Sequence, residues 1–469
     1  MIDVAIAGGG PVGMLLAAEL ALQGVRPVVF ERLAVPTGES KAGTLHARTA
    51  QSLLRRGLLE ETGWPTYGSQ RFHFSGMFGL DLGAVATDGP SIVGSPQAHA
   101  EQVFADRATR LGARIRRGAE VTGLVQHPTH VTLTVGGEEV QARYVVGADG
   151  ARSAVRKAAG IAFEGTPARV AALMGEVRLA PDVPGGWHRT PRGWLLVWPG
   201  AGGRARVTTY DFRAPHPDRE APVTLEELRE TASYIAGFPV GMSHPRTLTR
   251  YGDAALQAAA YRKGRVFVAG DAAHVHFPWG GQGLNTGLED AMNLGWKLAY
   301  ALAGRGGPGL LDSYHAERHP VAARVLWNVR AQNALAAPDP ALDPLRELFA
   351  SLMELDQVNA YLSGMISGLD TVYDVGVPGA GRMVPDLAVK TAAGEVRVAE
   401  LLQQGQPLFL DLGGHDDLVE LVAERVPVVR GVTSGEAPSA VLVRPDGYSA
   451  WTAGAGAAAL EEALTRWFL

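Results

Sequence analysis

The sequence predicts an α/β fold in three parts, and three observations lead to that prediction. A glycine-rich turn joins an apolar strand to an apolar helix within residues 4–22. Residues 171–262 are dominated by alternating strand patterns, and a Pro-Gly stretch at 378–381 precedes a last α/β segment. We therefore expect a nucleotide-binding domain, then a β-sheet domain, and a small α/β domain at the C-terminus.

Composition limits the chemistry. The 469 residues suffice for three domains of about 150 residues each. Lys+Arg number 43 and Asp+Glu 48, and the resulting net charge of −5 argues against nucleic-acid and anionic-membrane partners. We see neither a leader nor an apolar run of about 18 residues, and expect a cytoplasmic protein. Because the chain has 0 cysteines, it forms no disulfides or thiolate sites, so redox chemistry needs a bound cofactor.

The first element is a strand–turn–helix unit. Gly8, Gly10 and Gly13 match G-x-G-x-x-G after the buried-strand pattern 4–7. The first glycine allows a tight turn, the second lets backbone approach a pyrophosphate, and the third brings helix close to strand. Glu31 follows 18 positions after Gly13, at the end of the second strand, and is suited to a free ribose 2′-hydroxyl. An ADP-containing dinucleotide is therefore predicted, with NAD or FAD left open.

The later elements follow from hydrophobic period and turn residues. We expect helices over 46–57, 97–111, 225–236, 282–303 and 457–468, and strands over 120–126, 131–135, 141–146, 194–198, 206–212, 408–412 and 440–443. Pro320 is expected to divide or kink the helical stretch 310–332. The expected domains are 1–170, with 72–96 joining the substrate side, then 171–262, 263–375 and 376–469.

A second segment favours a flavin. The buried-strand pattern 266–269 leads into Gly270-Asp271, where a carboxylate at a strand's C-terminal end is suited to a ribityl chain. The loop 278–285 then opens a helix with several glycines. Free backbone amides at a helix N-terminus are suited to the negative charge of a reduced flavin.

Four segments together resemble the class A flavoprotein monooxygenases, which share the p-hydroxybenzoate hydroxylase fold. They are residues 8–13 with Glu31, 148–156, 270–271 and 278–287. Stretches at 31–40, 156–160, 312–319 and 444–447 resemble the polyketide-tailoring branch, in particular angucycline oxygenases. The resemblance runs nearly end to end. It implies a Rossmann-like FAD-binding domain, a β-sheet substrate domain and a thioredoxin-like C-terminal domain, which without cysteine is redox-inert.

The resemblance also implies which residues lie around FAD. They are Gly8, Gly10, Pro11, Val12, Gly13, Glu31, Arg32, Lys41, Arg48, Gln97, Asp149, Gly150, Asp271, Pro278, Gly281, Gly283, Leu284 and Asn285. Lys41 stands where many relatives have arginine, and it keeps the charge without the planar fork. NADPH is implied as a transient co-substrate, with NADH left open, because the chain has no second dinucleotide fingerprint.

The implied reaction is hydroxylation of an aromatic polyketide by NADPH and O₂ through a flavin C4a-hydroperoxide. The loop with Pro278, Gly280 and Gly281 would lie near the reacting ring, and no activating base is identified. Candidate substrate residues are Trp194, Phe212, Phe277 and Trp279, although each could equally be ordinary core.

Several alternatives stay open. Baeyer–Villiger oxygen insertion and inactivation of a rifamycin-type antibiotic remain within the family, and a catalytically silent flavin-binding assembly protein is the alternative outside it. A flavin halogenase is rejected, because residues 193–199 and Met14-Leu15 depart from the halogenase pattern. A metal site at His274/His276 or His315/His319 is not favoured, because no third ligand supports it. The oligomeric state, a homo-oligomer included, is left open.

Overall fold

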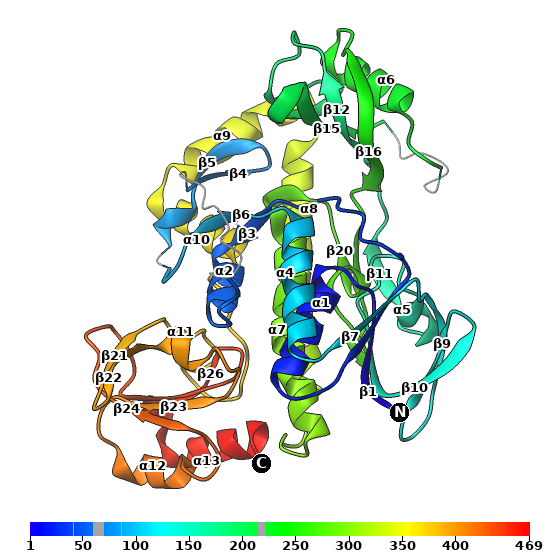
Figure 1. Cartoon of the computed structure of the whole chain (residues 1–469). Helices are drawn as coiled ribbons and strands as arrows, with labels where there is room; N and C mark the ends of the chain where they lie inside the picture. The colour runs from blue at the N-terminus through cyan, green and yellow to red at the C-terminus, as the bar shows by residue number, and fades with distance from the viewer. Residues whose placement is uncertain (41, 60–69, 86, 214–220) are drawn as a thin grey trace.

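The computed structural model describes residues 1–40, 42–59, 70–85, 87–213 and 221–469. Its first domain is built on a mainly parallel sheet with the order β18-β19-β10-β1-β2-β7. Strands β1, β7 and β10 of this sheet lie beside helix α1 in Figure 1. The strands are β1 (Ile2–Ala7), β2 (Val28–Glu31), β7 (Arg114–Arg117), β10 (Glu138–Gly147), β18 (Arg262–Lys263) and β19 (Val266–Val268). β8 (Val121–Gln126) and β9 (Val131–Val135) extend β10 as antiparallel neighbours. The predicted α/β fold is confirmed.

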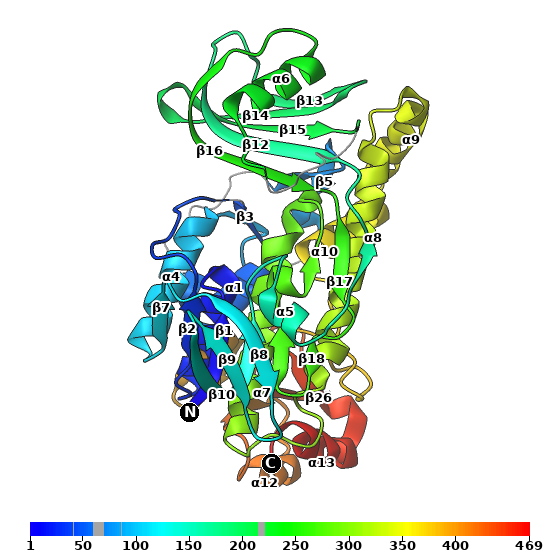
Figure 2. The same ribbon diagram turned by 90° about the vertical axis from the view of Figure 1, so that its right-hand side faces the viewer.

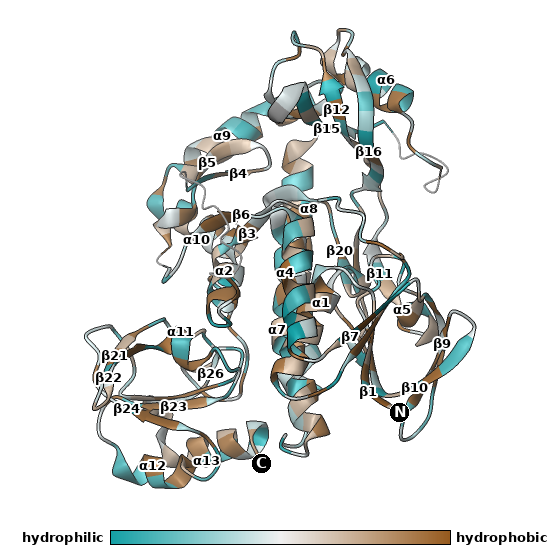
Figure 3. Cartoon of the chain, in the orientation of Figure 1, coloured by the Kyte–Doolittle hydropathy of each residue, from teal (hydrophilic) through white to brown (hydrophobic). Residues whose placement is uncertain are grey.

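Helix α1 (Pro11–Leu22) lies at the centre of this domain. It packs against α4 (Gln97–Arg110) and α7 (Gln282–Leu302), and its residues from Gly13 to Ala21 are buried. A helix that is apolar on all sides needs such neighbours, whereas α4 turns polar residues outward in the hydropathy view (Figure 3). The short strand β1 is buried in its last four residues, as its unbroken apolar run requires.

The second domain is an antiparallel sheet with the order β13-β14-β15-β12-β16. Its strands are β12 (Ala171–Leu179), β13 (Gly186–Thr190), β14 (Gly193–Pro199), β15 (Arg204–Asp211) and β16 (Met242–Gly252). Helix α6 (Leu225–Ala236) covers the face of the sheet that points away from the first domain (Figure 2). The sheet ends before the expected boundary at 262, because β17 (Ala255–Ala258) pairs with β11 (Phe163–Thr166) and β20 (His274–Val275).

Between the two domains lie a hairpin and three helices. The hairpin is β4 (Arg71–Phe74) and β5 (Met77–Asp81), while β6 (Ile92–Gly94) pairs with β3 (Thr44–His46) beside helix α2 (Ala47–Leu54). The helices are α8 (Ser313–Ala336), α9 (Asp343–Met353) and α10 (Asp356–Ser367). Pro320 lies inside α8, so of the two expected outcomes the division of this helix is wrong, and the kink stays a prediction. Contacts of α8 with α7 and β17 supply the stability that the missing backbone bond removes.

The C-terminal domain has its own sheet, with the order β24-β23-β25-β26. Its strands are β21 (Ala388–Thr391), β22 (Gly394–Arg397), β23 (Leu408–Asp411), β24 (Val428–Arg430), β25 (Ala440–Val443) and β26 (Ser449–Thr452), and its helices are α11 (Val398–Leu401), α12 (Asp416–Val422) and α13 (Gly456–Trp467). Its core also contains Trp296 and Tyr300 of α7, so the domain is joined to the first one by buried apolar surface. Across the described residues, no helix is both long and apolar enough to cross a membrane.

Candidate functional site

The glycine turn after β1 is shaped as its spacing predicts. Gly8 has φ +107°, and a Cβ there would lie 2.2 Å from the carbonyl oxygen of Ala148. A Cβ at Gly13 would lie 2.1 Å from the carbonyl oxygen of Gly8. A Cβ at Gly10, in contrast, would have no described atom within 4 Å. The first and third glycines therefore serve the close approach of helix and strands, and the second faces open space.

Glu31 closes this turn from the neighbouring strand. Its Oε2 accepts a hydrogen bond of 2.6 Å from the amide of Gly9, and its Oε1 accepts one of 2.9 Å from Leu33. The carboxylate thus lies beside the open space at Gly10. Pro11 is the first residue of α1, Val12 packs against Gly270, and Arg32 is exposed after the strand.

Two further segments come to the same edge of the sheet, because β10 and β19 run parallel to β1. Asp149 follows β10, and its Oδ2 accepts a hydrogen bond from the amide of Val155. Gly150, with φ +80°, allows the turn after it. Asp271 follows β19 and is exposed. Arg156 links the two segments, since it donates to the carbonyls of Ala151 and Ala272.

The loop before α7 forms the third side of the site. Gly280 and Gly281 have φ of +74° and +64°, which favours glycine, and no described side chain caps the N-terminus of α7. Asn285 fixes the loop: its Nδ2 donates to the carbonyls of Gly281 and Thr44, and its Oδ1 accepts from the amide of His46. Pro278 is exposed at the start of the loop, while Gly283 and Leu284 lie half-buried in the first turn of α7.

Two histidines border this loop: His46 is buried, and His276 is half-buried with a buried Nε2. Burial lowers the pKa of His46 and of His276 to about 4, so both rings are neutral near pH 7. His46 Nε2 lies 2.7 Å from the carbonyl oxygen of Gly280. Among the described residues, His46 Nδ1 and His276 Nε2 have no hydrogen-bond partner. His46 could not be recognised as a site residue from the sequence, and His276 was considered only as a disfavoured metal ligand, because a lone histidine carries no spacing signal.

The last three expected cofactor residues are Arg48, Gln97 and Lys41. The Arg48 guanidinium donates to the carbonyls of Gly368 and Leu369 and to the side chain of Gln51, beyond the end of α10. The structure therefore does not bring Arg48 together with the glycine turn. Gln97 begins α4 and is half-buried, whereas Lys41 lies outside the described residues.

The four candidate substrate residues belong to one aromatic cluster between the middle sheet and α8. Phe277, Trp279 and Trp194 are buried, with Phe212 partly buried beside them. The Trp279 ring lies 5.6 Å from that of Trp194, and their indole N–H groups donate to Asn333 and to the carbonyl of Ala336 on α8. The cluster also contains Tyr210 and three rings that were not expected there from the sequence, namely His73, Trp187 and Tyr251.

A cavity of about 310 Å³ is lined by the first turns of α7 together with α2, α8, the end of α10 and Tyr448. Arg48 and Glu289 are among the residues that line it. Burial raises the pKa of Glu289 to about 7, although Arg318 and Ser52 partly oppose that shift. In the described part of the chain, no three His, Asp or Glu side chains gather as a metal site.

The arrangement fits FAD. The donors are the amides of a glycine turn and an uncapped helix N-terminus, with carboxylates at the ends of neighbouring strands. Such a set recognises a pyrophosphate, two polyols and an electron-rich ring. A polar ring at that place would also explain the buried His276 Nε2 beside Gly283, which has no partner among the described residues, because buried polar atoms normally find a partner.

Comparison with known proteins decides the family. Residues 1–329 match the model of the FAD binding domain, and residues 377–468 match the aromatic-ring hydroxylase C-terminal domain. The chain belongs to the FAD-dependent aromatic-ring hydroxylases. The resemblance found in its motifs is thereby confirmed. Its first domain is an FAD-binding domain, so the cofactor is FAD.

Named relatives cover the whole hydroxylase. A Streptomyces rimosus 12-dehydrotetracycline 5-monooxygenase/anhydrotetracycline 6-monooxygenase is 41% identical over 99% of this chain and 98% of its own. A rifampicin monooxygenase of Streptomyces venezuelae is 41% identical over 100% and 99%. The solved structure of OxyS anhydrotetracycline hydroxylase from Streptomyces rimosus has a TM-score of 0.93 at 41% identity and covers 99% of each chain. The Diels-Alderase PyrE3 has a TM-score of 0.90 at 38% identity, with 100% of this chain and 99% of its own covered.

Proposed function

We propose that this hydroxylase uses NADPH and O₂ to hydroxylate a polycyclic aromatic polyketide. The observation that carries the proposal is the place of the uncapped α7 N-terminus, where Trp279 and Phe277 lead from the glycine loop straight into the aromatic cluster. A flavin ring at that helix end would face apolar, aromatic surroundings suited to a fused-ring substrate. Full-length relatives with tetracycline and rifampicin in their names support the same substrate class.

Each cofactor group has a proposed holder. The pyrophosphate takes the open space at Gly10, Glu31 accepts from the adenosine ribose, and Asp271 accepts from the ribityl chain. The other expected cofactor residues of the glycine turn, the Asp149-Gly150 segment and the 278–285 loop are proposed to contact the same ligand. Bound there, FAD supplies the electron transfer from NADPH to O₂ that no side chain of this chain can supply.

The chain's own contribution is to orient the reactants and exclude water. The α7 amides stabilise negative charge, since no described side chain competes for them. His46 and His276 stay neutral near pH 7 because of burial, so neither adds a positive charge there. Trp194, Phe212, Phe277 and Trp279 supply the apolar walls on the substrate side.

A decisive test uses the purified protein with FAD under argon. NADPH and, separately, NADH are added with or without anhydrotetracycline or rifampicin, and flavin absorbance is followed before air is admitted. We expect bleaching by NADPH that a fused-ring phenol accelerates, and then a product heavier by one oxygen atom in mass spectrometry. Oxygenation of rifampicin alone would favour the antibiotic-inactivating reading. A flavin that is never bleached would contradict the proposal and favour the catalytically silent alternative.

A further inference from the structure

The turn that carries Asp271 is held by a buried carboxylate. The amide of Gly270 donates to Asp290 Oδ2 on α7 over 3.1 Å, and His274 Nε2 lies 2.8 Å from the same oxygen. Burial would raise the pKa of Asp290, but Arg318 and His274 hold it below its usual value. The carboxylate is therefore ionised and only accepts, so His274 donates to it and the turn is fixed from two sides.

Arg318 of α8 is the hub of these contacts. Its Nε donates to Asp290 Oδ1 over 2.8 Å, its Nη2 to the carbonyl oxygen of Thr286 over 3.0 Å, and its Nη1 to the hydroxyl of Tyr373 over 3.0 Å. The side chain is 2% exposed and Asp290 is 0% exposed. One planar guanidinium thus fixes the Gly270 turn, the first part of α7 and Tyr373 in a single geometry.

Tyr373 belongs to the C-terminal side of the molecule. It packs in the apolar core of the C-terminal domain, and its ring lies 4.3 Å from that of Tyr448. Its backbone amide donates to the carbonyl of Gly381. The contact with Arg318 therefore joins the C-terminal domain to a turn of the FAD-binding domain through fully buried atoms.

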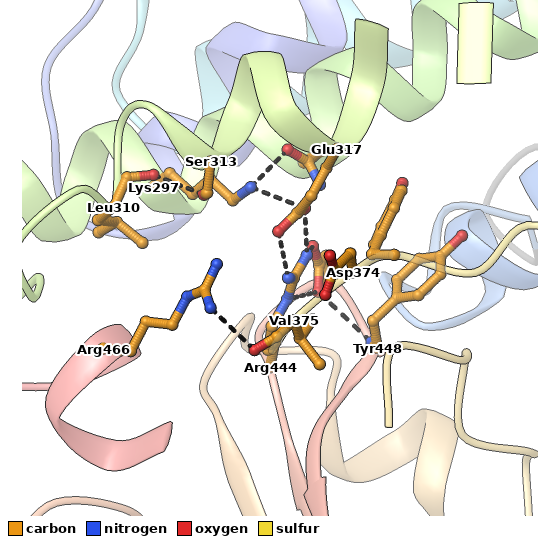
Figure 4. Close-up of polar contacts among 12 residues, drawn as sticks. Lys297, Leu310, Ser313, Glu317, Asp374, Val375, Arg444, Tyr448 and Arg466 are labelled. Atoms are coloured by element: carbon orange, nitrogen blue, oxygen red, sulfur yellow. Dashed lines mark hydrogen bonds and ion pairs between the residues drawn. The ribbon is translucent and has the colours of Figure 1, made fainter. Parts of the chain in front are cut away.

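A second contact, one residue away on α8, fastens the same junction. Glu317 accepts from both terminal nitrogens of Arg444, at 2.7 and 2.9 Å, and from Lys297 Nζ at 2.8 Å (Figure 4). Arg444 also pairs with Asp446 of the same domain. The Glu317–Arg444 ion pair fastens the C-terminal domain to α8. It thereby fixes the position of Tyr373 relative to Arg318.

We propose that Arg318 is a positioning residue through which the C-terminal domain sets the place of the Gly270-Asp271 turn and of the first turns of α7, and thereby the affinity for FAD. The inference rests on the proposed contact of these segments with FAD. It assigns a task to a domain that, without cysteine, can carry no dithiol chemistry. Ligand-holding segments need such support, because a polar group held loosely loses much of its binding energy.

The test compares three variants. Tyr373→Phe removes only the hydroxyl that Arg318 meets, Arg318→Lys keeps the charge but loses the fork, and Arg324→Lys is the control. Arg324 lies on the same helix in a solvent-exposed pair with Asp370. The dissociation constant of FAD is measured by flavin fluorescence well below the melting temperature. Hydrogen exchange of the FAD-free protein is measured for the peptides that cover 266–275 and 282–290.

We expect Tyr373→Phe to weaken FAD binding about threefold and Arg318→Lys about tenfold, the range typical of coupling through a packed network. Exchange at 266–275 should quicken in both, and Arg324→Lys should match the wild type in both measurements. Unchanged exchange and FAD affinity, together with a lower free energy of unfolding, would overturn the proposal and leave Arg318 a purely structural residue. If the wild type binds no FAD, the proposed function fails, and the exchange result alone decides the coupling.

Discussion

Buried polar atoms are arranged in opposite ways at two places in the molecule. One is the glycine edge, which comprises the glycine turn, the Asp149 segment and the loop 278–285. The other is the junction, where α7 and α8 meet the C-terminal domain. At the glycine edge, backbone amides face open space, and within the described residues Asp149 Oδ1 and His276 Nε2 are buried without a partner. At the junction, the charged groups of Glu317, Lys297 and Arg444 are fully buried and paired with one another. A buried polar atom without a partner costs about 1–3 kcal/mol, so the first pattern is one that a ligand would complete. The second pattern fixes how two domains meet.

At the glycine edge, a substitution of Gly13 should have a large effect on both stability and FAD binding. Alanine there would place Cβ 2.1 Å from the Gly8 carbonyl oxygen, so we expect Gly13→Ala to destabilise the protein by about 3 kcal/mol and to abolish FAD binding. Urea unfolding and flavin fluorescence measure the two effects.

Gly10→Ala is the matched variant, since its Cβ meets no described atom. It should keep the free energy of unfolding within about 0.5 kcal/mol of the wild type. Its FAD dissociation constant should nevertheless rise about tenfold, because the methyl group would occupy the space assigned to the pyrophosphate. Equal FAD affinity of Gly10→Ala and the wild type would show that the open space does not hold the cofactor.

A substitution at the junction should destabilise the protein at least as much as Gly13→Ala. Burial would raise the pKa of Glu317, but Arg444 and Lys297 bring it down to about 2, so the group is ionised at every ordinary pH. Arg444→Met leaves this charge with Lys297 and the side-chain amide of Asn293, and should cost about 3–5 kcal/mol in urea unfolding. The double variant Arg444→Met/Glu317→Gln should cost clearly less than the sum of the single variants. Strict additivity would contradict a direct interaction.

A pH dependence of stability is expected at Glu289. Its pKa is about 7 in the folded protein against 4.5 as the ordinary value, because the group is buried. Between these values the folded state binds more protons than the unfolded one, so this group makes stability fall as pH rises from 4.5 to 7. Glu289→Gln should therefore gain about 3 kcal/mol on the wild type between pH 4.5 and pH 8. The exposed Glu461→Gln should show no such gain, and parallel profiles for Glu289→Gln and the wild type would refute the shift.

The sequence was most informative where local spacing decides the structure. Gly8, Gly13 and Glu31 lie as their spacing required, because a strand, a turn and a helix fix one another over about 30 residues. Helix α6 even has the predicted bounds, 225–236.

Contacts between distant segments were not predictable. Arg318 and Tyr373 are 55 positions apart, and Glu317 and Arg444 are 127 apart, so no period or spacing joins them. Arg48 matched a family position, yet its hydrogen bonds go to carbonyls after α10, a choice that tertiary packing makes. Pro320 was expected to divide or kink the helical stretch, because local propensity ignores the neighbours that keep α8 continuous.

Helix α8 contacts the C-terminal domain near its start and the aromatic cluster near its end. Its 24 residues correspond to a length of about 36 Å. Near its start, Glu317 and Arg318 meet the C-terminal domain, and near its end Asn333 and Ala336 accept the indole protons of Trp279 and Trp194. A small tilt at one end is therefore a larger displacement at the other. The C-terminal domain is thus connected through α8 to the two indole groups of the aromatic cluster.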